Sequence, residues 1–302
     1  MANEFPSPDQ RILRGVAASL VWQPVDSDGT AADPGAAVTV DVARADGTVV
    51  ATAAATTGTG SEPRAYALSA ANNGLLDHLA VTWKVGGVAT ASTMVDVVGG
   101  YYASIADIRA AQPSLTDGSY PDEVVLRARW ETEIEFEAAC RVAFVPRYAR
   151  GRYSGRGLPV LPLAQPMLRS VRSVRYYSDA TNYTSETAPN VAAISADEGG
   201  IARFVNDVSV FPSGRANVVV EVEHGFDRPP ADVRQAFFAR VRSRLNMAKS
   251  GIPDRAVTYT TTEGGTFGIA TPSASWWETG LPEVDTVLRR YRDRFAPVLG
   301  IA

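Results

Sequence analysis

The sequence changes its pattern at Gly99-Gly100, and this change limits the possible folds more than any other feature. Before it, residues 11–98 alternate short runs rich in valine, threonine and aromatic residues with turn sequences such as Asp26-Ser27-Asp28-Gly29 and Asn72-Asn73-Gly74. Short strands joined by such turns are typical of antiparallel sheets. After it, apolar residues recur at helical spacing. The sequence therefore predicts an α+β chain with two domains, residues 1–99 and residues 100–302.

The first domain is predicted to be a small immunoglobulin-like β-sandwich. The expected strands cover residues 12–22, 38–42, 48–51, 65–68, 81–85 and 88–98. Six or seven short strands at this spacing are typical of a two-sheet sandwich. Trp22, Tyr66 and Trp83 are the expected core aromatics. The region contains no cysteine, so such a sandwich would lack the disulfide that joins the two sheets in antibody domains.

The second domain is predicted to be mainly helical, with a small sheet and a β-hairpin. Helix-start signals stand at four places: Ser104, Pro121, Pro229-Pro230 and Pro282. Serine caps helix N-termini and proline suits the first turn, so each signal predicts a helix just after it. Strands are expected over residues 170–177 and 217–223, and a hairpin is expected around Gly264-Gly265.

The last predicted helix has a narrow apolar stripe with arginines beside it. The stripe follows helical spacing through Val284, Leu288, Tyr291 and Phe295, and Pro297 ends the helix. The neighbouring arginines are Arg289, Arg290, Arg292 and Arg294. A helix of this kind can dock by its apolar face and meet acidic residues with its arginines.

The segment from Arg141 to Arg175 carries eight arginines and no Asp or Glu, inside a chain of net charge −4. Such a run suggests a surface that meets phosphates or an acidic partner. The sequence leaves three interpretations open: a solvated loop, contact with an acidic protein or another copy of this chain, and contact with DNA phosphates. The residues expected to make subunit or DNA-channel contacts are Arg147, Arg150, Arg152 and Arg156. We interpret the glycines among them as flexible spacers.

The composition argues against catalysis and against a bound cofactor or metal. The 302 residues include two histidines and one cysteine, and the sequence has neither a Gly-x-Ser-x-Gly elbow nor a complete phosphate-binding loop. Cys140 is expected to be a buried thiol. His78 is expected to have a turn or surface role, and His224 a structural role in a turn. No apolar run reaches the length of a membrane span, and the first residues lack a secretory signal. We therefore expect a non-enzymatic protein without cofactor, made in a cytoplasm and without membrane contact.

From residue 101 onward, an ordered series of motifs resembles the head-to-tail adaptor (connector, head-completion) proteins of long-tailed bacteriophages, especially those infecting actinobacteria. The series covers about residues 100–296. Its main members are Tyr101-Tyr102-Ala-Ser-Ile-Ala-Asp-Ile-Arg109, Phe144-Val-Pro-Arg147, Leu168-Arg-Ser-Val-Arg-Ser-Val174, Val218-Val-Val-Glu-Val-Glu-His-Gly-Phe226, Pro229-Pro-Ala-Asp-Val-Arg234 and Gly280-Leu-Pro-Glu-Val-Asp-Thr-Val-Leu-Arg-Arg-Tyr291.

The resemblance implies a structural virion protein of the neck, assembled as a ring of usually twelve copies. The ring would join the portal to the next neck or tail-terminator ring and continue the channel through which DNA leaves. The C-terminal segment from Leu281 would engage the portal through Val284, Leu288, Arg289, Arg290, Tyr291, Arg294 and Phe295. The resemblance assigns no role to the N-terminal sandwich. An alternative function is a β-sandwich binding module of the tail or baseplate that recognises a host surface.

Overall fold

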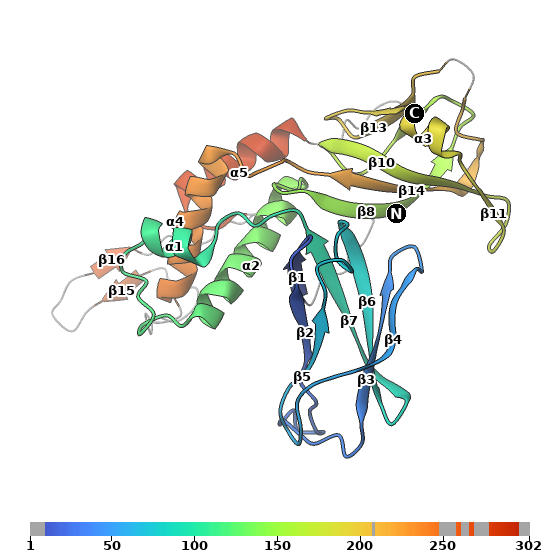
Figure 1. Ribbon diagram of the computed structural model, residues 1–302. Coiled ribbons are helices and arrows are strands. Elements are labelled where there is room, and N and C mark those ends of the chain that lie inside the picture. Colours follow the sequence, from blue (N-terminus) through green and yellow to red (C-terminus); the bar gives the residue numbers. More distant parts are fainter. Residues whose placement is uncertain (1–9, 207–208, 248–257, 261–265, 269–277, 296–302) are drawn as a thin grey trace. The chain divides into compact units, whose positions relative to one another are not determined.

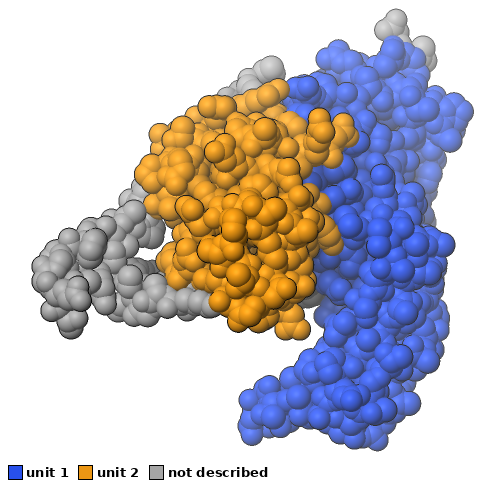
Figure 2. All heavy atoms as spheres, turned by 60° about the vertical axis from the view of Figure 1, so that its left-hand side comes forward, with its two compact units in different colours: residues 1–100, 145–225 blue, residues 101–144, 226–302 orange. Residues whose placement is uncertain are grey.

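The computed structural model describes residues 10–206, 209–247, 258–260, 266–268 and 278–295 (Figure 1). These residues form five helices and sixteen strands, so the predicted α+β class is confirmed. They divide into two compact units, and each unit is built from two separate segments (Figure 2). Unit 1 combines residues 1–100 with residues 145–225, and unit 2 combines residues 101–144 with residues 226–302. The predicted division into 1–99 and 100–302 therefore differs from these units, and independent folding of residues 1–99 stays a prediction.

The first part of unit 1, residues 10–98, is made of two sheets and is called the β-layer below. The larger sheet has the strand order β1 (Gln10–Leu13), β7 (Val88–Val98), β6 (Asp77–Val85), β3 (Val38–Arg44) and β4 (Val49–Ala55). The smaller sheet pairs β2 (Ala18–Trp22) with β5 (Arg64–Leu68). Both sheets share one core, in which Trp22 stacks on the fully buried Trp83 with ring centroids 5.9 Å apart. This arrangement confirms two β-sheets over one core, whereas the immunoglobulin-like assignment stays a prediction.

The single strand expected over residues 12–22 is two strands. Gly15 has a φ of +71°, a conformation that glycine adopts without steric cost. The chain turns there, so that β1 pairs with β7 in the larger sheet and β2 pairs with β5 in the smaller one. The β1–β7 pairing is parallel, with Ile12 opposite Val97, in a sheet that we expected to be antiparallel throughout.

The second part of unit 1, residues 145–225, is also built of strands, so the expected mainly helical character is wrong for this segment. A four-stranded sheet, called the arginine sheet below, has the order β11 (Tyr183–Ser185), β10 (Leu168–Tyr177), β14 (Gly214–His224) and β8 (Arg147–Gly155) (Figure 1). A three-stranded sheet of β12 (Ile194–Ala196), β13 (Ile201–Phe204) and β9 (Val160–Pro162) accompanies it, together with the short helix α3 (Ala188–Ala192). Alternate β14 residues Val218, Val220 and Val222 enter the shared core.

Residues 147–155, expected to be a loop with glycine spacers, form the edge strand β8. Its glycines are packing positions: a Cβ on Gly151 would lie 2.4 Å from the Tyr153 hydroxyl oxygen. A Cβ on Gly155 would lie 2.0 Å from the carbonyl oxygen of Pro212. The absence of a side chain lets neighbouring groups approach the backbone closely, so these glycines order the strand.

Unit 2 is helical and starts its helices where the sequence predicted. The helices are α1 (Ile105–Ala111), α2 (Asp122–Cys140), α4 (Ala231–Met247) and α5 (Pro282–Arg294). Ser104 and Asp107 form the capping box of α1, and Pro121 occupies the N-cap position of α2. The core contains Phe136 and Phe237, whose rings meet edge to face at 6.5 Å. Strands β15 (Thr258–Thr260) and β16 (Thr266–Gly268) confirm the pairing expected around Gly264-Gly265, which itself lies outside the described residues.

Candidate functional site

Helix α5 uses its apolar stripe inside unit 2. Val284 and Leu288 are fully buried. The Tyr291 hydroxyl donates a hydrogen bond to Asp232 Oδ1 on α4 at 3.0 Å, and its ring meets the Phe144 ring edge to face at 5.2 Å. Burial, and then the neighbouring Asp232 carboxylate, raises the pKa of Tyr291 to about 12. Val284, Leu288 and Tyr291 are therefore part of the core of unit 2, whereas Phe295 at the end of the stripe is half-buried.

The arginines of α5 lie on the accessible side of the helix. The side chains of Arg289 and Arg290 are 59% and 68% exposed and make ion pairs with Glu278 at 3.5 Å and Asp232 at 3.1 Å. Arg294 is exposed, with its guanidinium 5.2 Å from the ring centroid of the half-buried Phe295. Exposed pairs of this kind stabilise a fold only slightly, so these guanidiniums remain suited to an outside partner.

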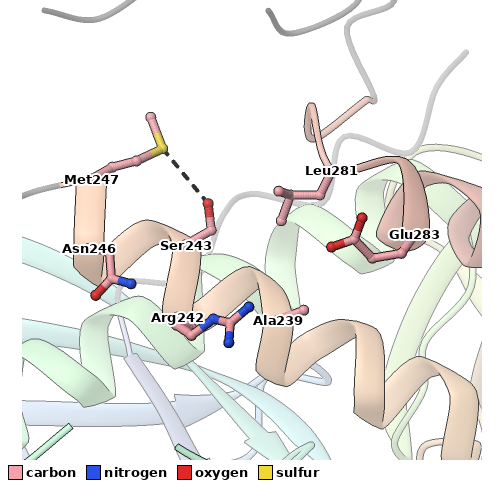
Figure 3. Close-up of a pocket in the computed structure, with 7 residues that line it drawn as sticks. All are labelled: Ala239, Arg242, Ser243, Asn246, Met247, Leu281 and Glu283. Carbon is pink, nitrogen blue, oxygen red and sulfur yellow. Dashed lines mark hydrogen bonds between the residues drawn. The ribbon is translucent and has the colours of Figure 1, made fainter. Parts of the chain in front are cut away.

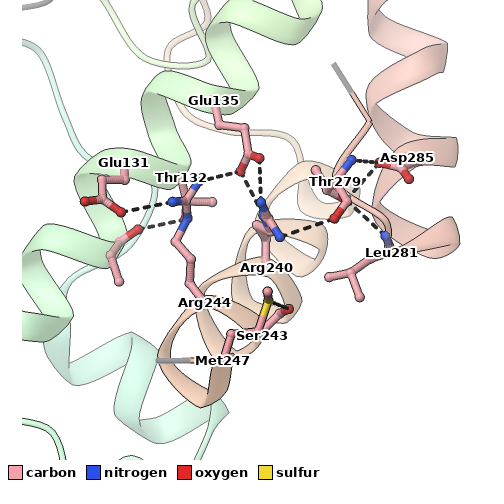
Figure 4. A network of polar contacts seen from close by, with 11 residues as sticks. Glu131, Thr132, Glu135, Arg240, Ser243, Arg244, Met247, Thr279, Leu281 and Asp285 are labelled. Carbon is pink, nitrogen blue, oxygen red and sulfur yellow. Dashed lines mark hydrogen bonds and ion pairs between the residues drawn. The ribbon is translucent and has the colours of Figure 1, made fainter. Parts of the chain in front are cut away.

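A network of charged side chains fixes α4 against α2 (Figure 4). Glu135 on α2 accepts two hydrogen bonds from Arg240, at 2.7 and 2.8 Å, and one from Arg244 at 2.9 Å. Burial opposes the ionisation of Glu135, but the two guanidiniums outweigh burial and lower its pKa. Arg240 also donates to the Thr279 carbonyl oxygen, and Thr279 donates to Asp285 at the start of α5. The network therefore connects the N-terminus of α5 with both long helices.

Two glutamates of α2 have partners on other elements. Glu135 pairs with arginines of α4. Glu133 is buried and accepts the backbone N–H of Tyr102 at 3.0 Å. These carboxylates hold unit 2 together.

In the arginine sheet, Arg147 is buried and ion-paired. Its guanidinium lies 2.9 Å from Asp96 Oδ2 of β7, and the same carboxylate faces Arg11 at 3.7 Å and His78 at 3.4 Å. Burial alone would raise the pKa of Asp96, but Arg147, His78 and Arg11 outweigh it and lower the pKa to about 2. Arg147 thus joins the β-layer to the arginine sheet within unit 1, and its contact with another subunit or DNA stays a prediction.

Three more arginines of the predicted basic segment have internal partners. Arg150 lies 3.5 Å from Glu221 of β14 and donates to the carbonyl oxygen of Ala45. Arg175 lies 3.7 Å from the same Glu221, and Arg172 lies 3.5 Å from Glu223. The segment has no carboxylate of its own, but strand pairing brings two carboxylates from β14 against it. With Arg147, four of the eight arginines of this segment therefore face carboxylates within unit 1.

Arg152 and Arg156 remain exposed at the far end of β8. The guanidinium of Arg152 lies 4.4 Å from the ring centroid of Tyr177. Neither arginine makes an ion pair with any residue that the structure describes. Their predicted role as a subunit or DNA contact stays a prediction.

The candidate nucleophile and histidines have structural surroundings. Cys140 is buried, and its thiol donates to the carbonyl oxygen of Leu288 at 3.4 Å. Burial raises the pKa of this thiol to about 12, which suppresses the reactive thiolate. The His78 ring packs edge to face on Tyr148 at 5.4 Å, and His224 is buried at the end of β14.

No group of three or more His, Cys, Asp or Glu residues within the described ranges is placed to hold a metal ion. None of the helices in the described residues is long and apolar enough to cross a membrane.

A shallow hollow of about 330 Å³ lies on unit 2 between α4 and the start of α5 (Figure 3). Its lining includes Ala239, Ser243 and Met247 of α4 and Leu281 near the start of α5. Arg242 and Glu283 are its charged members. Among the described residues that line the hollow, no buried polar groups converge as they do in small-molecule sites.

Known proteins give a limited comparison. No protein-family profile matches the chain, and no curated protein matches it. Among solved structures, the chain is similar to a protein in the neck of an empty gene transfer agent (GTA) particle, with a TM-score of 0.43, 15% identity and coverage of 63% of this chain and 89% of that one. A chain of the native GTA virion gives a TM-score of 0.41 and 14% identity over 63% and 89% of the two chains. A chain of the native GTA neck gives a TM-score of 0.39 and 15% identity, with coverage of 64% of this chain and 93% of that one.

Proposed function

We propose that this chain is a structural protein of the neck of a phage-like particle. A ring of copies, twelve in number, joins the portal to the next neck or tail-terminator ring and continues the DNA channel. The ordered motifs of residues 101–291 support this proposal, because they coincide with the elements that build the structure: Ser104 caps α1, Pro229-Pro230 precede α4 and Pro282 opens α5. The protein is made in the host cytoplasm and resides in the virion.

The observation that carries the docking part of the proposal is the division of helix α5 into two faces. Val284 and Leu288 anchor the helix in its own unit, so the helix is held in place without a partner. Arg289, Arg290 and Arg294 face outward and present a row of guanidiniums. A planar guanidinium binds carboxylates through two parallel hydrogen bonds. The portal surface that meets α5 is therefore acidic, and the apolar stripe has no part in the contact.

Cryo-electron microscopy of intact particles, with a masked reconstruction of the neck, tests the proposal. Density for this chain as a ring between portal and tail is the expected result. Density at the tail tip instead would overturn it and favour a host-binding module. The loops at residues 23–37 and 57–63 of the β-layer contain no aromatic residue, which gives the host-binding alternative no stacking platform for sugars.

The docking face is tested by reversing its charge with the variant Arg289→Glu, Arg290→Glu, Arg294→Glu. The variant is expected to fold and to lose incorporation into portal-containing particles, because its carboxylates would oppose an acidic partner. Incorporation is measured by quantifying the chain in purified particles.

The matched control reverses three exposed arginines elsewhere, Arg14, Arg127 and Arg228. It carries the same change of charge and is expected to enter particles like the unaltered chain. Equal incorporation of the two variants would contradict the assignment of α5 as the docking face.

A further inference from the structure

Three exposed arginines lie toward one end of the arginine sheet, where β8 ends and β14 begins. Arg152 and Arg156 come from the β8 side and Arg215 from the β14 side, and the two strands are held in register there by the pair Gly155–Gly214. We call Arg152, Arg156 and Arg215 the arginine tip. None of the three makes an ion pair with a residue in the described part of the chain. This contrasts with Arg147, Arg150, Arg172 and Arg175, which all face carboxylates.

The backbone that carries the arginine tip is tightly ordered. Asn217 accepts the N–H of Gly155 at 3.0 Å and donates to the carbonyl oxygen of Pro212 at 2.9 Å. The N–H of Ala216, a residue with a φ of +49°, donates to Ser154 Oγ at 2.9 Å. These bonds fix the bulge between the strands. Ordered side chains and backbone reduce the entropy that a partner must overcome on binding.

Aromatic and apolar side chains surround the arginine tip. Arg152 lies over Tyr177, and the Tyr177 and Tyr183 rings lie 5.2 Å apart. Leu158, 52% exposed, and the exposed Val210 stand beside the bridge that joins Leu158 to Phe211. Arginine, tyrosine and apolar side chains together are typical of protein–protein interfaces. Interfaces with DNA are more polar and much more positive. The surroundings therefore favour a protein partner that offers carboxylates.

The same chain offers such carboxylates at the opposite end of the β-layer, in the acidic loops of residues 23–37 and 57–63. Asp26, Asp28 and Glu62 are exposed and make no ion pair with any described residue. Asp26 Oδ1 accepts the N–H groups of Asp28 and Thr30, each at 2.9 Å, which orders the loop. Val25, 56% exposed, stands beside them. The acidic loops thus combine negative charge with an apolar group and complement the arginine tip.

Strand register places the acidic loops far from the arginine sheet. Strand β6 begins at Asp77 and His78, where the β-layer meets Tyr148 of β8, and runs nine residues to Val85. At about 3.3 Å per residue this strand is roughly 30 Å long. The acidic loops lie at the Val85 end, because the neighbouring β3 starts there, directly after residue 37. In the described part of one copy, no ion pair joins the acidic loops to the arginine tip.

We propose that the acidic loops of one copy bind the arginine tip of the next copy. Each copy then uses two different surfaces, so the contact is head-to-tail and repeats from copy to copy. Closure of this repeat into a ring rests on the proposed neck function, whereas the contact itself does not.

Charge exchange between the two surfaces tests the proposal. One variant carries Arg152→Glu, Arg156→Glu and Arg215→Glu, and a second carries Asp26→Lys, Asp28→Lys and Glu62→Lys. Sedimentation velocity of the full chain at low ionic strength is expected to show self-association of the unaltered protein. Each variant alone is expected to associate at least about tenfold more weakly, because its two contact surfaces carry the same sign. Their equimolar mixture is expected to regain association, since both contacts are again of opposite sign.

The triple reversal of Arg14, Arg127 and Arg228 is the matched control and is expected to associate like the unaltered chain. A monomeric unaltered chain, or a mixture that does not regain association, would overturn the proposal. Fluorescence anisotropy with a short DNA duplex is the second readout. Duplex binding that the arginine-tip variant abolishes, without any change in self-association, would assign the arginine tip to nucleic acid. The outcome is independent of where the chain lies in the particle.

Discussion

At the scale of single residues, the buried carboxylate of Asp96 is the centre of a charged cluster in unit 1. It faces the guanidiniums of Arg147 and Arg11 and the imidazole of His78, which come from three different strands. A buried charge costs free energy unless it is paired, and here each member needs the others. The cluster therefore helps to hold β8 against the β-layer, together with the packing of His78 on Tyr148.

We predict that Asp96→Asn lowers the free energy of unfolding by about 3–5 kcal/mol at neutral pH, because it leaves the Arg147 charge buried without a counter-charge. The pH dependence follows from the lowered pKa of Asp96, about 2 against an ordinary 3.8. A lowered pKa stabilises the folded state above about pH 4, and this contribution is lost as the pH falls toward 2. Urea denaturation across this range measures both effects.

The Asp96→Asn protein should show a flatter loss of stability between pH 4 and pH 2 than the unaltered chain. Asp28→Asn, which removes an exposed carboxylate, is the control and should change the free energy of unfolding by less than about 0.5 kcal/mol. Equal effects of the two substitutions would refute the role assigned to the buried cluster.

A second prediction at this scale concerns Gly155, where the Pro212 carbonyl approaches the backbone. We expect Gly155→Ala to lower the free energy of unfolding by about 1–3 kcal/mol. The new methyl group would lie 2.0 Å from the Pro212 carbonyl oxygen, so this oxygen would have to move. Gly118→Ala is the control, since a Cβ there meets nothing within 4 Å. Thermal denaturation of both variants measures the difference in stability. Similar unfolding midpoints would show that the backbone at Gly155 can shift to accept the methyl group, which contradicts the prediction.

At the scale of elements, the helices of unit 2 are joined by a few strong polar contacts as well as by their core. Glu135 of α2 bonds two arginines of α4, and Glu131 bonds one of the same arginines from a more exposed position. Hydrogen bonds to charged groups gain strength as water is excluded. The two glutamates lie one helical turn apart, so a more buried and a more exposed ion pair can be compared within one helix.

We predict that Glu135→Gln lowers the free energy of unfolding by about 1–3 kcal/mol, because Arg240 and Arg244 lose their shared counter-charge. Glu131→Gln should cost less than about 1 kcal/mol, since its carboxylate is 45% exposed and its pair is screened by water. Chemical denaturation measures both. A larger loss for Glu131→Gln would contradict the assignment of Glu135 as the central carboxylate.

At the scale of the whole molecule, unit 1 contains the two hydrophobic cores of its sheets, and unit 2 packs its helices around Phe136 and Phe237. Cys140 lies in the core of unit 2 and Asp96 in unit 1. Because burial raises the pKa of the Cys140 thiol to about 12, the thiol reacts with alkylating reagents only when unit 2 opens. Its labelling rate is therefore a reporter for one unit.

We predict that Leu288→Ala accelerates labelling of Cys140 strongly, because removing a fully buried leucine costs about 2–5 kcal/mol. Asp96→Asn should leave the labelling rate nearly unchanged, because this substitution lowers the stability of unit 1, whereas Cys140 lies in unit 2. The measurement is thiol alkylation in native buffer, followed by mass spectrometry. Equal acceleration by both substitutions would show that the two units open together.

The burial of Val284 and Leu288 also explains why deleting α5 is not a clean test of portal docking. Deleting the helix would also remove Val284 and Leu288 from the core of unit 2, so a lost interaction would be indistinguishable from unfolding. Substitution of its outward arginines separates the two effects.

The sequence by itself determined the starts of the helices and the α+β class. Ser104, Pro121 and Pro282 mark helix starts by capping and by fixed backbone geometry, which depend on a few neighbouring residues. Alternating apolar residues marked residues 81–85 of β6, because each strand places every second side chain in the core.

Only the tertiary structure decided which residues face one another. Residues 147–155 look like a loop because their glycines and arginines favour no strand locally, yet pairing with β14 makes them one. The charge of Arg147 looked available until Asp96, more than fifty positions earlier, was brought to 2.9 Å. The stripe of α5 looked like a docking face until α2 and α4 covered it. In each case the deciding partner is distant in sequence, and periodicity or composition within a segment carries no information about it.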